Sequence, residues 1–267
     1  GGEPAPHMEG LSSPLAPLLI CGALANDARL QQGGEPGQFH ALGEPTDGAL
    51  VVAAARLGLW QGDLEQALPR VAEWPFESER KRMTTVHRVV PIPVPAGANS
   101  LPEAGRAPAG TRLGAQAPGP EHPSPAAVTV GLEDRPAVAA ALGLEGVPYV
   151  ALTKGAVDGL LAISTRVWVG GRTEPLDASW RARIEAAHEQ LARQGMRVLG
   201  AGFRPLTSFD AGAPAEAVER ELTLVGLFGL IDPPRPEVKG AVQTSKSAGM
   251  RPVMITGDHP LTAQQIA

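Results

Sequence analysis

The sequence predicts an α/β fold: a mostly antiparallel sheet flanked by helices over residues 11–222, then part of a second α/β domain over residues 223–267. The first observation behind this is the alternation of amphipathic helical segments with short apolar runs. The second is composition, because 43% hydrophobic residues can build a packed core, which aliphatic side chains must mostly fill since only 4% of residues are aromatic. The third is the final stretch, which resembles a strand, a helix and a second strand in succession. Residues 1–10 are polar and predict a flexible end.

The first third of the chain predicts helices followed by a β-hairpin. Pro17 suits the first turn of the first helix, and Thr46 is a suitable N-cap for the second. The hairpin follows from two segments rich in β-forming residues that are joined by a charged turn. The expected elements are a helix over 14–30, a Gly- and Gln-rich loop over 31–42, a helix after Thr46, a short helix around 63–68, and strands over 71–76 and 83–90.

Residues 91–125 have a different composition. Nine of these residues are proline, most of the others are Gly, Ala or Ser, and no apolar periodicity remains. Such a segment cannot bury enough apolar surface to offset its ordering entropy, so we predict a disordered surface insertion within the domain. After it we expect strand 126–131, helix 133–142, strand 147–153, helix 156–163, helix 177–194, strand 197–203 and strand 222–230.

The C-terminal segment predicts part of a parallel sheet. The run Asp232-Pro233-Pro234-Arg235 ends the preceding strand, because proline cannot donate to a sheet ladder. A helix fits residues 236–248, and the apolar residues 253–255 are typical of a buried parallel strand. The turn that follows contains Thr256, Gly257 and Asp258. A hydroxyl and a glycine between a strand and a helix N-terminus suit a phosphoryl group.

Composition also excludes several classes of function. The net charge of −5 and the absence of a basic run argue against a nucleic-acid partner. Cys21 is the only cysteine, so neither an internal disulfide nor a cysteine-based zinc site can form. The six histidines show no metal-ligand spacing, so we predict no metal site in the chain. No apolar segment reaches the roughly 18 residues that span a bilayer.

Several short segments occur in an order that resembles a known family. They are Asn26-Asp27-Ala28, Gly43-Glu44-Pro45-Thr46-Asp47, Phe76-Glu77-Ser78-Glu79-Arg80-Lys81-Arg82-Met83, Lys154-Gly155-Ala156, and the run from Asp232 to Asp258. Together they resemble the cytoplasmic part of P-type cation-transporting ATPases, specifically the calcium-pump-like group. The resemblance covers about residues 14–90 and 126–267. It implies a nucleotide-binding domain followed by a partial Rossmann-like phosphorylation domain of the haloacid-dehalogenase type.

The resemblance also implies roles for individual residues. Phe76 would stack on adenine, with Lys81 and Met83 beside the pocket, and an aromatic face contributes roughly 1–3 kcal/mol to base binding. Asp47 matches the carboxylate that approaches the adenine amino group, although the family has the longer glutamate there. The other matches are Lys154 and Gly155 for binding, Arg197 near the phosphates, Thr256 with Gly257 and Asp258 for the transferring phosphoryl group, and Asn26, Asp27 and Ala28 as structural residues.

Each motif also has a simpler explanation that does not involve a ligand. The segment around Phe76 could be a solvated hairpin turn with one core phenylalanine. Lys154 and Gly155 could mark an ordinary strand-to-helix turn, and Thr46 could act only as a helix cap. Arg197 could be a surface residue at the start of a strand.

The implied function is that of the cytoplasmic ATP-binding part of an ion-translocating membrane pump, with ATP and its accompanying Mg²⁺ as ligands. The partners would be the remaining pump domains and membrane helices. Because neither DKTGT nor GDGxND occurs here, we expect a piece lying between those motifs that binds ATP without turning it over. One alternative is a free-standing haloacid-dehalogenase-type phosphohydrolase, which needs a D-x-D nucleophile that is absent. Another is a degenerate scaffold that has lost nucleotide binding.

Overall fold

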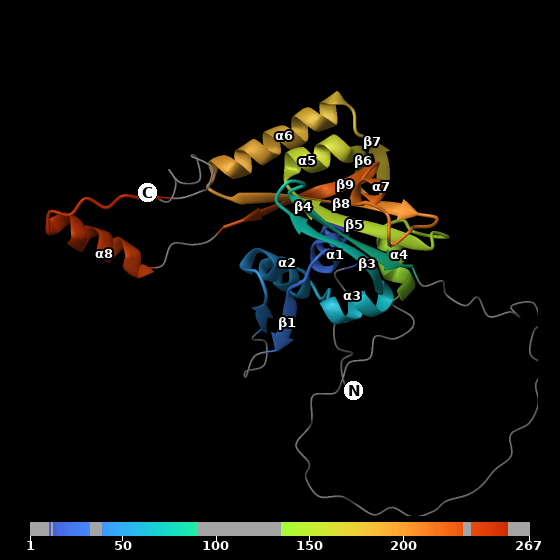
Figure 1. The fold of residues 1–267 in the computed structure, drawn as a ribbon, viewed down its shortest axis with the longest axis horizontal. Coiled ribbons are helices and arrows are strands. Elements are labelled where there is room, and N and C mark those ends of the chain that lie inside the picture. The colour runs from blue at the N-terminus through green and yellow to red at the C-terminus, as the bar shows by residue number, and fades with distance from the viewer. Residues whose placement is uncertain (1–10, 12, 33–38, 90–134, 232–235, 256–267) are drawn as a thin grey trace, which may run out of the picture.

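A seven-stranded sheet with helices on both faces forms the centre of the protein (Figure 1). The computed structural model describes residues 11, 13–32, 39–89, 135–231 and 236–255. The strand order is β3-β4-β5-β8-β9-β6-β7. Neighbouring strands are antiparallel except for the parallel pair β6 and β9, which confirms the mostly antiparallel sheet expected from the sequence.

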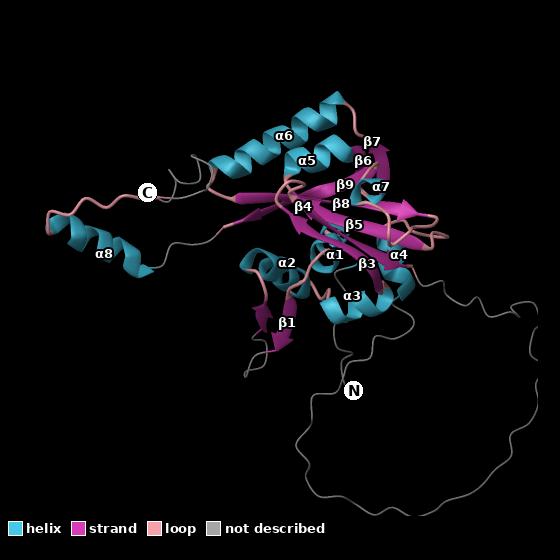
Figure 2. Ribbon diagram, in the orientation of Figure 1, coloured by secondary structure: helices cyan, strands magenta, loops and turns pink. Residues whose placement is uncertain are grey.

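Figure 2 shows how helices and strands are distributed over the described residues. The helices are α1 (Ala16–Leu24), α2 (Pro45–Ala55), α3 (Gln61–Ala67), α4 (Arg135–Ala141), α5 (Val157–Ile163), α6 (Ala178–Arg193), α7 (Ala215–Val218) and α8 (Pro236–Ser247). The sheet contains β3 (Arg70–Glu77), β4 (Arg82–Arg88), β5 (Tyr149–Gly155), β6 (Ser164–Val169), β7 (Arg172–Pro175), β8 (Arg197–Leu206) and β9 (Leu222–Leu230). A separate antiparallel pair consists of β1 (Arg29–Gln32) and β2 (Phe39–Leu42).

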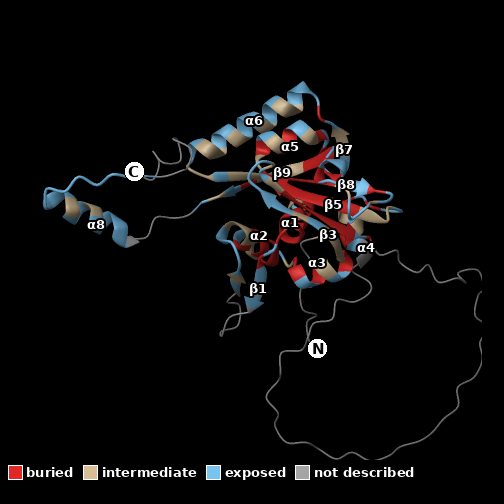
Figure 3. Ribbon diagram, in the orientation of Figure 1, coloured by how far each residue is buried: buried red, intermediate tan, exposed pale blue. Residues whose placement is uncertain are grey.

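The larger core lies between α1 and one face of the sheet. The helix is apolar on nearly all sides and contacts β5, β8 and β9, so its residues are buried except for the half-buried Leu18 (Figure 3). Gly22 allows this close approach, because an added Cβ would lie 2.6 Å from the ring of Phe228. The buried aliphatic residues of α2, α3 and α4 extend this core. The result is a rigid platform beneath one face of the sheet.

The opposite face of the sheet carries α5 and α6. Their smaller core includes Leu160, Leu161 and Leu224, with Trp180 and Ile184 of α6 packed against it. Asp177 caps α6, since its carboxylate accepts a hydrogen bond of 2.9 Å from the Trp180 amide. The predicted amphipathic helix over 177–194 is therefore confirmed, although no residue of it is fully buried.

Three local expectations near the N-terminus and after α5 are wrong. The helix expected over 14–30 ends at Leu24, because the Asn26 side chain donates to the Gly22 carbonyl and the chain turns there. Part of the expected loop over 31–42 forms β2 and the end of β1. Residues 164–175, for which we expected no element, form the β6–β7 hairpin.

Thr46 does not cap α2. The N-cap position is Glu44, which makes no side-chain cap, and Pro45 opens the helix. The Thr46 hydroxyl instead accepts a hydrogen bond of 3.1 Å from Arg197. The simple capping explanation for this segment is therefore wrong.

The sheet continues past residue 222, where we expected the first domain to end. Strand β9 lies between β8 and β6, so this sheet reaches Leu230. The position of β9 depends on its pairing with β8 and β6, and a local sequence pattern does not indicate which strands will pair. The predicted helix over 236–248 is confirmed as α8, and none of its residues from Glu237 on is buried (Figure 3).

The strand expected over 253–255 is not formed. Val253, Met254 and Ile255 are 75%, 46% and 94% exposed, and no strand among the described residues pairs with them. Without a pairing partner an apolar tripeptide cannot satisfy its backbone groups as a strand. Other predictions lie outside the described residues: the end over 1–10, the insertion 91–125, the strand 126–131, the break Asp232–Arg235, and the turn with Thr256, Gly257 and Asp258.

Candidate functional site

Strand register places three of the predicted site residues on one face of the sheet. Met83 of β4 lies opposite Lys154 of β5, which in turn lies opposite Ala201 of β8. Arg197 precedes Ala201 by an even number of residues on the same strand, and side chains alternate between faces with a period of two. Met83, Lys154 and Arg197 therefore share the face that carries α1 and α2.

Lys154 is a nearly buried cation held by a carboxylate. Its side chain is only 7% exposed, and its Nζ donates to Asp47 Oδ1 at 2.6 Å. Burial lowers the pKa of Lys154 from its ordinary value, while the hydrogen bond and charge of Asp47 oppose that change. The pair joins the end of β5 to the first turn of α2.

Asn26 fixes the position of Asp47. Its buried amide nitrogen donates to the carbonyl oxygens of Asp47 and Gly22, both at 2.9 Å, and its Oδ1 accepts from the Ala28 amide at 2.8 Å. The contact with Asp47 ties the loop after α1 to the start of α2, and the other two fix Asn26 within that loop. This confirms the structural role expected for Asn26 and shows what it supports.

Arg197 reaches the same turn of α2 from β8. Its Nη1 donates to Thr46 Oγ1 at 3.1 Å, next to the residue that binds Lys154. Two cationic side chains and one carboxylate thus converge on the N-terminus of α2, where the helix dipole adds positive potential.

An exposed aromatic ring lies at the same end of the sheet. Phe76, at the end of β3, is 61% exposed, which is unusual for a phenylalanine. The explanation of Phe76 as a core residue of the hairpin is therefore wrong. Its neighbour Glu77 pairs with Arg82 of β4, which pairs with Gly155 of β5. The ring therefore stands two strands away from the end of β5 that carries Lys154.

The turn between β3 and β4 is packed against the end of β5. Lys81 is exposed and has a left-handed backbone, with φ of 49°, and its amide donates to the Glu77 carbonyl at 2.7 Å. The Ala156 amide donates to the Lys81 carbonyl at 2.9 Å. Gly155 permits this contact, because an added Cβ would lie 2.5 Å from both that carbonyl oxygen and Arg82 Cβ.

The structure thus brings most of the predicted binding residues to one end of the sheet. Asp47, Lys154 and Arg197 surround the start of α2, and Phe76, Lys81 and Gly155 lie on adjacent strand ends. Met83 is only 2% exposed, so it packs beneath this surface and offers no open face. Thr256, Gly257 and Asp258 lie outside the described residues.

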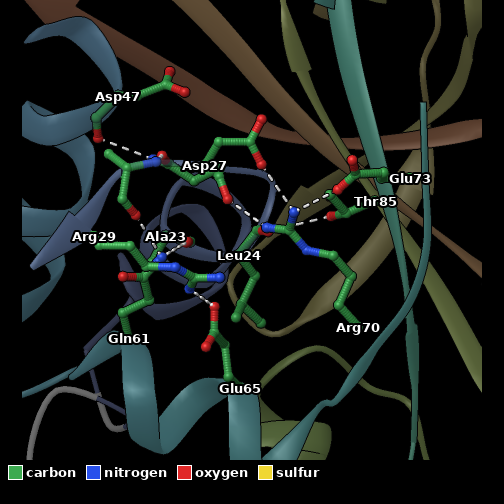
Figure 4. Close-up of polar contacts among 12 residues, drawn as sticks. Ala23, Leu24, Asp27, Arg29, Asp47, Gln61, Glu65, Arg70, Glu73 and Thr85 are labelled. Carbon is green, nitrogen blue, oxygen red and sulfur yellow. Dashed lines mark hydrogen bonds and ion pairs between the residues drawn. The ribbon is translucent and has the colours of Figure 1, made fainter. Parts of the chain in front are cut away.

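A polar cluster behind the start of α2 was missed by the sequence reasoning (Figure 4). The Arg70 guanidinium lies between Asp27 and Glu73, at 2.9 and 2.8 Å, and also donates to the Leu24 carbonyl at 3.1 Å. Gln61 donates to the Ala28 carbonyl at 2.9 Å. These contacts join the loop after α1 to α3 and β3. The charge of Asp27 also opposes the lowering of the Lys154 pKa by burial. An isolated arginine at the start of a strand carries no local signal for such a role.

Two further features are absent from the described residues. No group of three or more His, Cys, Asp or Glu side chains among them could hold a metal ion. None of the helices within the described ranges is long and apolar enough to cross a membrane.

Comparison with known proteins places this arrangement in a family. The family described as "P-type ATPase, cytoplasmic domain N" matches residues 15–91 and 138–237, which is more than half of the chain. A calcium-transporting ATPase of Bacillus subtilis is 30% identical over 95% of this chain and 22% of its own length. A probable cation-transporting ATPase F of Mycobacterium bovis is 32% identical over 99% of the chain and 23% of its own length. The cation-transporting ATPase pma1 of Synechocystis is 29% identical over 97% and 22%.

The chain therefore spans less than a quarter of the length of these curated relatives. The matched segments include the α2 start, the β3–β4 hairpin, the end of β5 and the whole of β8 and β9. The chain belongs to the family of P-type ATPase cytoplasmic N domains.

Proposed function

We propose that this domain binds ATP for phosphoryl transfer to an aspartate in a DKTGT segment, which the present sequence does not contain, within a cation-translocating P-type ATPase. The observation that carries the proposal is the buried Lys154 ammonium, held by Asp47 beside Arg197, at the end of the sheet where the β3–β4 hairpin exposes Phe76. Membership in the family and the names of the relatives support it. The remaining domains and membrane helices of such a pump would be its partners.

The residues divide into a part for the base and a part for the phosphates. The exposed ring of Phe76 offers a face on which adenine would stack, a contact that contributes roughly 1–3 kcal/mol. Lys154 would lay its stem along the base while keeping its charge near Asp47. Arg197 and Lys81 would supply positive charge toward the phosphates.

Mg²⁺ would arrive with the nucleotide, bound to its phosphate oxygens. The described residues contain no carboxylate cluster that could hold it alone, and Mg²⁺ in nucleotide sites typically uses phosphates and water as ligands. Residues after β9 would belong to a second, phosphorylation domain, in which Thr256, Gly257 and Asp258 would hold the transferring phosphoryl group. The aspartate that accepts the phosphoryl group would come from that domain of the pump.

One titration and one assay test this proposal. We expect saturable ATP binding, with Kd on the order of 0.1–10 mM, and no sustained release of phosphate with or without Mg²⁺. Lys154→Ala should weaken binding, whereas Arg193→Ala should not, because Arg193 lies on α6 at the opposite face and pairs only with Glu189 among the contacts seen. Sustained hydrolysis abolished by Thr256→Ala would instead establish a phosphohydrolase. No ATP binding at all would indicate a scaffold.

A further inference from the structure

A buried carboxylate lies on the face of the sheet opposite Lys154. Glu219, between α7 and β9, has a side chain that is 0% exposed. Its Oε2 accepts from Arg82 Nε at 2.7 Å, and its Oε1 accepts from Thr84 Oγ1 at 2.8 Å and from the guanidinium of Arg80. Thr84 is in turn 2.9 Å from the Thr153 hydroxyl of β5. A single acidic group thus holds two arginines of the β3–β4 hairpin.

Arg80 carries this contact to both sides of Phe76. Its Nη2 donates to the Pro75 carbonyl at 2.8 Å, and its Nε donates to Glu77 Oε2 at 2.8 Å. Pro75 precedes the exposed ring and Glu77 follows it. The Arg80 side chain is only 11% exposed, although its bonds to Glu77 and to the Pro75 carbonyl lie at the surface.

Arg82 links Glu219 to the end of β5, which carries Lys154 and Gly155. It pairs with Gly155 across β4 and β5, and its Cβ is one of the atoms against which Gly155 packs. Lys81 lies between the two arginines that Glu219 binds. Phe76 is thus flanked by two residues that bind Arg80, and Lys81 is flanked by the two arginines that bind Glu219.

We propose that Glu219 is a positioning residue for nucleotide binding, which acts through Arg80 and Arg82 to hold Phe76 and Lys81 in place. The inference rests on the proposed function. An exposed ring gains little order from packing of its own, so its orientation depends on the backbone that carries it. Fixing that backbone before ATP arrives reduces the ordering cost of binding. The carboxylate itself lies on the opposite face of the sheet and touches no nucleotide.

Four proteins in a mutant cycle test this role: wild type, Glu219→Gln, Phe76→Ala and the double variant, each titrated with ATP. Gln keeps the size of the side chain but removes the charge that binds both guanidinium groups. We expect Glu219→Gln to weaken ATP binding about fivefold when Phe76 is present and less than about twofold when Phe76 is already Ala. A carboxylate with only a structural role would weaken binding equally in both backgrounds.

Glu221→Gln is the matched control. Glu221 lies in the same short segment and pairs with Arg204 at 3.0 Å, but its side chain is 62% exposed and it makes none of the contacts to the hairpin described above. ATP affinity should be unchanged in this variant. A loss equal to that of Glu219→Gln would overturn the proposal.

Arg80→Lys keeps the test decisive if Glu219→Gln does not fold. Lysine retains a charge for Glu219 but cannot reach Glu219, Glu77 and the Pro75 carbonyl at once, so we expect the same loss of affinity. Unchanged affinity in a folded Glu219→Gln or Arg80→Lys protein overturns the inference, as does an equal loss in both Phe76 backgrounds. If wild type binds ATP and Phe76→Ala weakens it, the proposed function stands even when this inference fails. If wild type binds no ATP, both fall.

Discussion

The ion pair between Lys154 and Asp47 should respond unequally to the loss of its two members. Lys154 is 7% exposed in its side chain, whereas Asp47 is 19% exposed. Asp47→Asn leaves a nearly buried ammonium without its carboxylate, and Lys154→Met leaves a carboxylate that water can reach. Removing one partner of a fully buried pair costs about 3–5 kcal/mol, and exposed pairs are worth about 0–1 kcal/mol. We therefore expect a loss of about 2–3 kcal/mol for Asp47→Asn and about 1 kcal/mol for Lys154→Met.

The pH dependence of the free energy of unfolding provides a second test of the same ion pair. Burial lowers the pKa of Lys154 below its ordinary 10.5, and Asp47 opposes this, so Asp47→Asn should lower the pKa further. In that variant the unfolded chain binds more protons than the folded one at alkaline pH, and stability then rises with pH. The difference in the free energy of unfolding between wild type and Asp47→Asn should therefore become smaller as pH rises from 7 toward 10.5.

Urea unfolding followed by tryptophan fluorescence, at pH 7 and pH 9.5, measures both effects. Arg193→Met is the control, since it removes a surface pair whose side chains are 64% and 60% exposed and should cost less than about 0.5 kcal/mol. If Lys154→Met costs as much as Asp47→Asn at pH 7, the burial argument is wrong. A deficit of Asp47→Asn that widens with pH would contradict the assigned direction of the pKa shift.

Three further predictions concern other residues of this region. Burial lowers the pKa of His87 to about 4, although the hydrogen bond with the Leu68 carbonyl opposes this. The stability that the neutral His87 ring contributes is therefore fully present above pH 6.5 and is lost as pH falls through 4. The loss should be roughly 3 kcal/mol in urea unfolding, and a wild-type profile that matches that of His87→Asn would contradict it. Gly155→Ala should destabilise by about 1–3 kcal/mol because its Cβ meets the Lys81 carbonyl, whereas Gly159→Ala, whose nearest neighbour is 3.8 Å away, should not destabilise; equal unfolding midpoints would refute this. Phe76→Ala should weaken ATP and AMP alike by about 1–3 kcal/mol in calorimetric titrations without a change in melting temperature, and unchanged affinity would show that the base binds elsewhere.

Local patterns were enough to predict most individual elements. The hairpin around Phe76 was predictable because β-forming residues flank a charged turn, and α6 because its apolar residues recur with helical spacing. The β6–β7 hairpin was missed although its turn, Gly170-Gly171, carries a hairpin signal, and both residues have positive φ. The flanking strands are short and partly polar, which hid them.

Contacts between distant segments were not predictable from pattern. Lys154 and Asp47 are 107 positions apart, and Glu219 lies 139 positions from Arg80. A resemblance to a family pointed to Lys154 and Asp47 but could not reveal that they pair with each other. Neither the position of β9 in the sheet nor the partners of Glu219 can be predicted from the neighbouring residues in the sequence, because both depend on strand order.

Titration of the isotopically labelled protein with ATP, followed by amide NMR, tests whether ATP binds at this end of the sheet. We expect saturable shifts that cluster on the first turn of α2, on residues 76–83 and around Lys154 and Gly155, with little change along α6. Absence of saturable shifts up to about 10 mM ATP, or shifts concentrated on α6 and the opposite face of the sheet, would contradict it.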